Sequence, residues 1–244
     1  MSGSDVSAHN EEAGAARAGS RWFLAVVAAF IAALLTSNII AVRIVTLGDA
    51  PVFGELLVTS AIVVFPLSYI VGDVLTEVYG YAVARRVIWA GFGANLVMVI
   101  AIYLGGLLPA ASEWGDQAAY DTILGFTGRL LVASFIAYVI GSFTNAIILA
   151  RLKVMTKGRM LWLRTISSTV GGQALDSFFF TFIAFLGVLS TGDVWRIFFV
   201  EWFTKVVYET VATPFTYAVV TFLKKQEGID VYDESTNLNP LAVR

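Results

Sequence analysis

Long apolar runs alternate with short polar segments along most of the chain. A helix needs roughly 20 predominantly apolar residues to cross a bilayer. Runs of about this length lie at approximately Trp22–Val45, Leu56–Gly72, Val87–Leu108, Leu130–Leu152, Leu161–Leu189 and Ile197–Leu223. The pattern therefore predicts an all-α integral membrane protein, with six transmembrane helices over residues 21–224.

The two ends of the chain lack such runs. Residues 1–20 are rich in Ala, Gly, Ser and acidic residues, which is typical of a disordered, solvated tail. A signal peptide is the alternative, since Arg17 and Arg21 precede the first apolar run, but that run exceeds the 7–15 residues of a signal sequence. Residues 225–244 are predicted to form a short C-terminal tail.

Composition supports a membrane protein. Hydrophobic residues make up 58% of the chain and charged residues 14%, against about 25% charged in soluble domains. A net charge of −2 disfavours a basic nucleic-acid binder. The chain has no Cys, which excludes disulfides, thiolate metal sites and Cys nucleophiles.

The distribution of Lys and Arg predicts the orientation, because positive residues near membrane ends stay on the cytoplasmic side. With both termini inside, Arg43, Arg129 and Arg196 lie outside, and Lys205 lies within the last helix. The remaining basic residues all lie on the inner face: Arg17, Arg21, Arg85, Arg86, Arg151, Lys153, Lys157, Arg159, Arg164, Lys224, Lys225 and Arg244. This asymmetry supports an even number of spans.

Three ionisable residues fall deep within predicted helices: Asp176, Lys205 and Glu209. Such groups cost roughly 2.5–3.5 kcal/mol each at a helix centre and so indicate function. Lys205 and Glu209 are four residues apart and can form a structural ion pair, or they can serve coupling. Asp176 requires either a ligand or a cation from another helix, and Lys205 is the candidate cation.

Other polar and aromatic residues extend this set. Gln173 lies one helical turn before Asp176, and the stripe containing Tyr138 ends at Asn145. Asn145 suits either substrate binding or a hydrogen bond between helices. Asn38 lies in the outer half of the first helix.

Four residues spaced four apart lie along one face at the end of the second predicted helix. It contains Phe65, Tyr69, Asp73 and Glu77, so an aromatic pair leads to two carboxylates. The alternative is that both carboxylates are interfacial and pair with Arg85 and Arg86. A second ladder, Ala25, Ala29 and Ala33, offers close packing to another helix of the chain, to a partner or to a second copy.

Catalytic motifs are missing from the sequence. The only His is His9, and neither a Gly-x-Ser-x-Gly nor a phosphate-binding Gly-x4-Gly-Lys motif occurs. An intramembrane aspartyl enzyme using Asp73 and Asp176 is disfavoured, because neither carries that class's motif. The chain is therefore predicted to be no enzyme and to carry no metal or cofactor.

Several motifs resemble the queuosine precursor transporter family. The most specific block is Asp-x3-Glu-x-Tyr-Gly-x4-Arg, from Asp73 to Arg85. The likeness extends over residues 36–240 and includes Ser37–Arg43, Phe65–Gly80 with Ala84–Arg86, Ala133-Ser134, Asn145, Trp162–Ser168, Gly172-Gln173 with Asp176-Ser177, Lys205, Pro214 and Lys224–Asp233. Residues 109–128 contribute little.

The resemblance implies a multi-pass importer in the inner membrane of a bacterium, with queuine, 7-cyano-7-deazaguanine or 7-aminomethyl-7-deazaguanine as substrate. It implies a secondary carrier, similar in helix count to the substrate-binding subunits of energy-coupling-factor importers. Such a subunit, serving an ATP-driven importer of a vitamin-like molecule, is the alternative.

The chemistry of a deazaguanine suits the predicted residues. Its N1–H and amino group can donate to Asp176, while amides satisfy its other edge atoms and aromatic rings stack on its face. The predicted substrate-binding residues are Asn38, Phe65, Tyr69, Asp73, Glu77, Tyr138, Asn145, Gln173 and Asp176. Asp73 and Glu77 are candidates for a gate or a second polar contact, and Lys205 and Glu209 for coupling.

Overall fold

The computed structural model describes residues 22–50, 54–125 and 128–242. The predicted tail at residues 1–20 lies outside this part of the chain. The helices are α2 (Phe23–Ile40), α3 (Phe65–Val74), α4 (Tyr81–Gly106), α5 (Gln117–Leu124), α6 (Gly128–Met155), α7 (Leu161–Phe185) and α8 (Thr191–Glu227). The remaining elements are strands β1 (Ile44–Ala50) and β2 (Gly54–Thr59), the 3₁₀ turn η1 (Ser60–Val63) and the π-helical turn η2 (Leu75–Tyr79).

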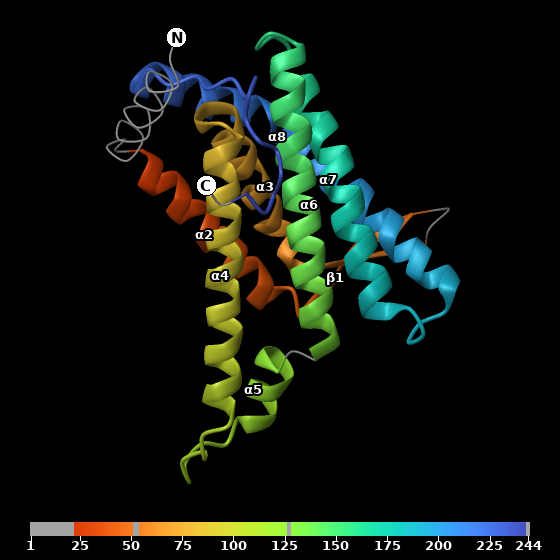
Figure 1. Ribbon diagram of the computed structural model, residues 1–244. Helices are drawn as coiled ribbons and strands as arrows, with labels where there is room; N and C mark the ends of the chain where they lie inside the picture. The colour runs from red at the N-terminus through yellow and green to blue at the C-terminus, as the bar shows by residue number, and fades with distance from the viewer. Residues whose placement is uncertain (1–21, 51–53, 126–127, 243–244) are drawn as a thin grey trace.

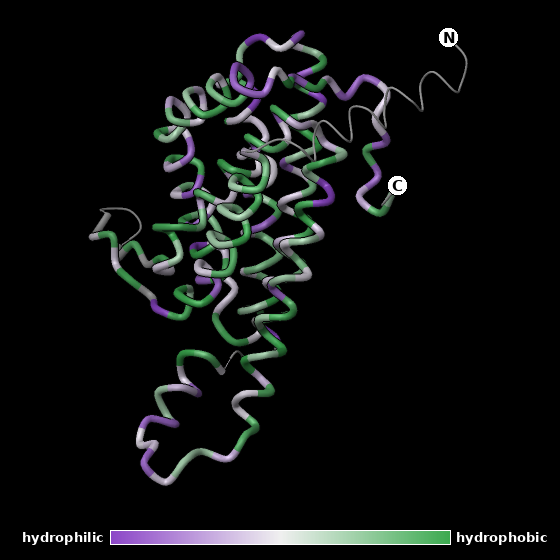
Figure 2. The backbone as a smooth tube through the Cα atoms, turned by 90° about the vertical axis from the view of Figure 1, so that its left-hand side faces the viewer, coloured by the Kyte–Doolittle hydropathy of each residue, from purple (hydrophilic) through white to green (hydrophobic). Residues whose placement is uncertain are grey.

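The long helices form a bundle in which α4, α6 and α7 stand side by side and α8 crosses behind α7 (Figure 1). Within the described part of the chain, four segments are long and apolar enough to cross a membrane: α2, α4, Leu131–Met155 of α6, and α8. Hydrophobic residues cover most of the bundle, and polar residues gather at its ends (Figure 2). The predicted class, a helical membrane protein, is confirmed.

The second predicted helix, over 56–72, is wrong in its first half. β2 occupies Gly54–Thr59 and pairs antiparallel with β1, and α3 begins only at Phe65. The first helix likewise ends at Ile40 instead of Val45. β-branched residues such as Val45, Thr46 and Val58 favour strands. The apolar run predicted to form one helix therefore begins within the second strand of a hairpin.

The segment from α3 to α4 has an irregular backbone. Pro66 lies in the first turn of α3, where its missing N–H costs no hydrogen bond. The helix then widens into η2 and ends at Gly80, whose φ is +84°. A Cβ on Gly80 would lie 2.6 Å from Val231 Cγ1, so both the backbone and the packed C-terminal segment require glycine here. Irregular turns of this kind position Glu77 inside the bundle.

The C-terminal segment after α8 folds back along the start of α4. The Arg85 guanidinium donates to the carbonyls of Asn237 and Asn239, and Trp89 Nε1 donates to Pro240 O. At the same end, the backbone N–H of Trp22 donates to Glu227 Oε1. The start of α2 and the end of α8 therefore lie together.

Glycines allow α6 and α7 to approach closely. A Cβ on Gly141 would lie 2.7 Å from the Cβ of Asp176, and one on Gly172 would lie 2.7 Å from the Cβ of Asn145. Small residues commonly allow such crossings in membrane bundles. Of the predicted alanine ladder, Ala33 is buried within the chain, whereas Ala25 and Ala29 are exposed.

Candidate functional site: a polar pocket and two buried charge clusters

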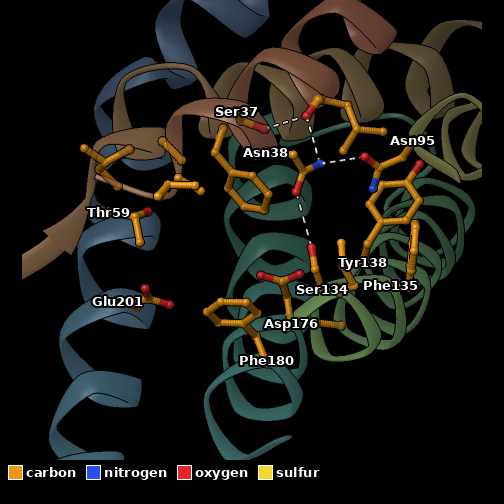
Figure 3. Close-up of a pocket in the computed structure, with 18 of the residues that line it drawn as sticks. Ser37, Asn38, Thr59, Asn95, Ser134, Phe135, Tyr138, Asp176, Phe180 and Glu201 are labelled. Carbon is orange, nitrogen blue, oxygen red and sulfur yellow. Dashed lines mark hydrogen bonds between the residues drawn. The ribbon is translucent and has the colours of Figure 1, made fainter. Parts of the chain in front are cut away.

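A pocket of about 170 Å³ lies among α2, β2, α3, α4, α6, α7 and α8 (Figure 3). It is much larger than the 10–15 Å³ that holds one water molecule. Its walls come from the end of α2, the start of α6 and the second half of α7. The pocket therefore lies toward the end of the bundle opposite the C-terminal segment.

One wall of the pocket carries a chain of amides and hydroxyls. Asn38 Nδ2 donates to Leu34 O at 3.0 Å and to Asn95 Oδ1 at 3.3 Å. Ser134 Oγ donates to Asn38 Oδ1 at 3.3 Å. These contacts orient the Asn38 amide, so the wall presents preplaced donors and acceptors.

The facing wall carries charges from α7 and α8. Lys205 Nζ lies 2.9 Å from Asp176 Oδ2 and 3.9 Å from Glu201 Oε2. The ammonium also lies 4.7 Å from the centre of the Phe65 ring. Lys205 thus bridges two carboxylates and forms no ion pair with Glu209, so the predicted i,i+4 pair is not formed. If all three groups are ionised, this wall has a net charge of −1.

Aromatic rings close the pocket. Phe65, Phe135, Tyr138 and Phe180 line it. Tyr138 is 6% exposed, and its hydroxyl donates to Ile88 O at 2.9 Å. Flat apolar walls beside convergent polar groups are typical of a site for a small aromatic ligand.

Tyr138 also lines a smaller cavity deeper in the bundle. This cavity has a volume of about 20 Å³, enough for one water molecule, and its polar lining includes Tyr69, Ser142 and Asn145. Tyr138 is therefore the shared wall between the pocket and the next polar layer.

Two carboxyl groups occupy that next layer. Asp73 is 1% exposed and accepts a 2.6 Å hydrogen bond from Asn145 Nδ2. Glu209 is 2% exposed and lies beside Asp73 and Thr169. Asp73 Oδ2, both Glu209 oxygens and Gln173 Oε1 are buried without a hydrogen-bond partner in the structure.

Glu77, one turn beyond Asp73, has an opposite environment. Its Oε1 lies 2.8 Å from Arg164 Nη2, 2.7 Å from Lys224 Nζ and 3.7 Å from Lys153 Nζ. Asp230 adds a second carboxylate, 2.5 Å from Lys153 and 2.9 Å from Lys224. We call these five residues the Glu77 network. It joins η2, the end of α6, the start of α7, the end of α8 and the C-terminal segment.

Comparison with known proteins identifies the family of the chain. Residues 59–219 match the model of a family described as "Putative vitamin uptake transporter". The chain belongs to this family. The matched range spans the elements from the end of β2 to most of α8 and so includes most of the pocket.

Curated relatives of this vitamin uptake transporter family member include proteins of bacteria. A "Probable queuosine precursor transporter" of Bacillus subtilis (strain 168) is 31% identical over 196 residues, which cover 75% of this chain and 85% of the relative. A "Queuosine precursor transporter" of Escherichia coli (strain K12) is 28% identical over 124 residues, about half of each chain. No solved structure matches the chain.

The structure brings only part of the predicted binding set to the pocket. Asn38, Phe65, Tyr138 and Asp176 line it. Four other predicted residues lie in the deeper layer, and Glu77 lies in its own network. The four are Tyr69, Asp73, Asn145 and Gln173.

Sequence reasoning missed Asn95 and Glu201, which both line the pocket. Glu201 had a usable signal, since it starts the i,i+4 row that continues with Lys205 and Glu209. Asn95 had none, because its role depends on α4 meeting α2. Among the described residues, no group of three His, Cys, Asp or Glu side chains is arranged to hold a metal ion.

Proposed function

We propose that this vitamin uptake transporter family member imports a queuosine precursor and binds its 7-deazaguanine base in the polar pocket. The names of the relatives support the substrate class. The observation that carries the assignment is the pocket itself, where Asp176 and Glu201 face preplaced amides between aromatic walls.

The base fits this lining chemically. Its N1–H and exocyclic amino group donate to a carboxylate, either Asp176 or Glu201, and its O6 accepts from Lys205 or an amide. Its flat face stacks on Phe65, Phe180 or Tyr138. Because buried polar groups left unpaired are costly, a base that satisfies them is favoured over an apolar molecule of the same size.

The charge of the pocket bears on which precursor is preferred. Asp176 and Glu201 share a single cation, Lys205, which leaves an excess of one negative charge when all three groups are ionised. A precursor with a protonated amine neutralises this excess, whereas a cyano group does not. We therefore expect 7-aminomethyl-7-deazaguanine to bind more tightly than its 7-cyano counterpart.

We propose six passes with both termini in the cytoplasm of a bacterium. The second pass runs through η1, α3 and η2, because the β1–β2 hairpin begins and ends at the same place. The fifth pass is α7, which carries Arg164, Gln173 and Asp176. The adjacency of the start of α2 and the end of α8 supports an even number of passes. The basic residues of the Glu77 network lie at that same end, as expected of a cytoplasmic face.

This placement suggests how the carrier works. The pocket lies toward the outer end, and the Glu77 network closes the inner end. Alternating access around a buried site requires one end to be closed while the other admits substrate. We propose that the inner end opens when the Glu77 network separates, and that the chain acts as a secondary carrier. The second candidate is a substrate-binding subunit of a larger importer, because the exposed Ala25 and Ala29 could pack against a partner protein.

Ligand-induced thermal shifts of the purified protein test the assignment. The panel contains queuine, its two precursors, guanine and common vitamins. We expect the 7-deazaguanines to raise the melting temperature, and Asp176→Asn and Glu201→Gln to reduce that shift. The matched controls are Asp116→Asn and Glu113→Gln. Both positions are exposed and lie between α4 and α5. No shift with any 7-deazaguanine would contradict the proposed function.

Uptake by proteoliposomes that contain only this chain separates the two candidates. A secondary carrier accumulates or exchanges the base without a partner protein. Intact ligand binding with no exchange would favour the substrate-binding subunit.

A further inference from the structure

Asp73 and Glu209 form a buried carboxyl pair between the pocket and the inner end. Asp73 comes from α3 and Glu209 from the middle of α8. The two side chains are neighbours, and both are at least 98% buried. We call them the carboxyl pair.

No described Lys or Arg neutralises the carboxyl pair. Neither residue forms an ion pair within 4 Å with any basic side chain in the described part of the chain, whereas the buried carboxylates Glu77, Asp176 and Glu201 each do. Asn145 donates one hydrogen bond to Asp73, and three of the four carboxyl oxygens have no partner. The polar and charged groups that face the pair are Glu77, Asn145 and Thr169, together with Tyr69, which lies near Glu209.

Two adjacent carboxylates cannot both remain ionised in such a place. Like charges at contact distance in a low dielectric strongly disfavour double ionisation, and burial penalises each charge further. A single proton held between the two oxygens removes one charge and supplies the missing hydrogen bond. The arrangement of the pair therefore favours a bound proton without any other ligand.

A route connects the pair to the pocket. The cavity of about 20 Å³ adjoins Asn145 and Tyr69 and has room for one water molecule with several polar partners. Tyr138 separates this cavity from the pocket, and Tyr69 lies near both Asp176 and Glu209. On the other side, Glu77 follows Asp73 by one turn and belongs to the network that closes the inner end.

We propose that the carboxyl pair is the proton-binding site that couples import of the base to the proton gradient. This inference rests on the proposed function. A proton from water on the pocket side adds to a carboxylate oxygen of the pair while the inner end is closed. The same proton leaves to cytoplasmic water after the Glu77 network separates, so each cycle moves one base and one proton inward.

Transport by the full chain in proteoliposomes tests the coupling. With the outside acidic, we expect the wild type to accumulate labelled 7-aminomethyl-7-deazaguanine at least tenfold and to carry protons inward, as reported by an internal pH-sensitive dye. Asp73→Asn and Glu209→Gln should abolish gradient-driven accumulation and keep exchange of base across the membrane. Asp116→Asn and Glu113→Gln should behave as the wild type.

Infrared difference spectra recorded against pH test the proton site independently of transport. We expect the carbonyl band of a protonated carboxyl group in the wild type and both controls, and its loss in each pair variant. Absence of that band, or wild-type exchange that ignores the pH gradient, would overturn the proton site and leave the proposed function intact. A band without binding or exchange of any 7-deazaguanine would instead overturn the proposed function.

Discussion

Asp73 and Glu77 are two acidic residues one helical turn apart, yet their surroundings are opposite. Glu77 accepts from Arg164 and Lys224 and lies within 4 Å of Lys153. Asp73 has a neutral amide, Asn145, and a second carboxyl group, Glu209. Both are at least 99% buried. Burial alone therefore does not determine what a carboxylate does; the charges brought to it by other helices decide.

The difference suggests different roles. Three cations and two carboxylates give the Glu77 network a net charge of +1 when all are ionised, so each carboxylate stays charged and holds several helix ends together. The carboxyl pair has no such compensation, and we propose that it binds and releases a proton. A gate and a proton site can therefore lie on one continuous segment.

The largest effect is expected for Glu77→Gln. This change removes the one carboxylate that pairs with Arg164 among the described residues, and it leaves Lys153 and Lys224 with Asp230, which is partly exposed. Leaving a buried charge without its partner costs about 3–5 kcal/mol. The melting temperature of the detergent-purified protein should fall sharply, while Glu113→Gln should leave it unchanged. An unaltered melting temperature for Glu77→Gln would show that the network does not hold the helix ends together.

Lys205→Met should have the next largest effect. The change removes the cation from Asp176 and Glu201 and the ammonium from the Phe65 ring. We expect the free energy of unfolding to fall by about 1.5–3 kcal/mol, the range for hydrogen bonds to charged groups. The ligand-induced thermal shift should also be lost. The double variant Lys205→Met, Asp176→Asn should regain stability, because it leaves one fewer buried charge. Strictly additive losses would indicate that the two residues do not interact.

Asp73→Asn should change stability by less than about 1 kcal/mol, because no cation loses a partner and one uncompensated carboxyl group is removed. The expected melting temperature is equal to or above that of the wild type. Replacing a carboxylate by an amide is thus expected to have opposite effects on stability at Asp73 and at Glu77, one helical turn apart. A fall as large as that of Glu77→Gln would mean that an undescribed cation neutralises Asp73.

The smallest effect is expected when the pH is lowered until Asp230 becomes protonated. Burial raises the pKa of this carboxyl group, but hydrogen bonds from Lys153 and Lys224 outweigh it and hold the pKa below its usual value. Because the pKa is lower in the folded form, the ionised carboxylate stabilises that form at pH values above the usual pKa of about 3.9. This contribution is lost as the pH falls through the pKa of the folded form. Hydrogen-exchange protection of residues 229–242 should therefore stay constant from pH 8 to pH 5 and fall only below about pH 4.

Asp230→Asn provides the matching test. It should weaken protection of the same segment at every pH above 4, since the amide cannot replace a charge between two ammonium groups. Loss of protection in the wild type between pH 7 and pH 5 would contradict the assignment to Asp230.

Part of the candidate site followed from sequence patterns. Asn38, Phe65, Tyr138 and Asp176 were selected as polar or aromatic residues at membrane depth, and they line the pocket. Helical spacing offered Glu209 as the partner of Lys205, but α7 supplies Asp176 at 2.9 Å instead. Spacing along one helix describes only which side chains share a face, and it contains no information on which neighbouring helix approaches that face.

The hairpin shows a second limit. A hydropathy window treats residues 56–72 as one apolar run, although its first part is strand β2. Hydropathy measures only transfer into an apolar medium, so an apolar run does not by itself distinguish a strand from a helix.

The sequence by itself determined the membrane environment, the helical class and the few ionisable residues at depth, because these depend on composition and on spacing along one helix. Only the tertiary structure decided how those residues divide. It joined Asp176 to Lys205, gave Glu77 three cations, and placed Asp73 beside Glu209. Electrostatic energy depends on distances between helices, and those distances arise from packing, such as the close crossing at Gly141 and Gly172.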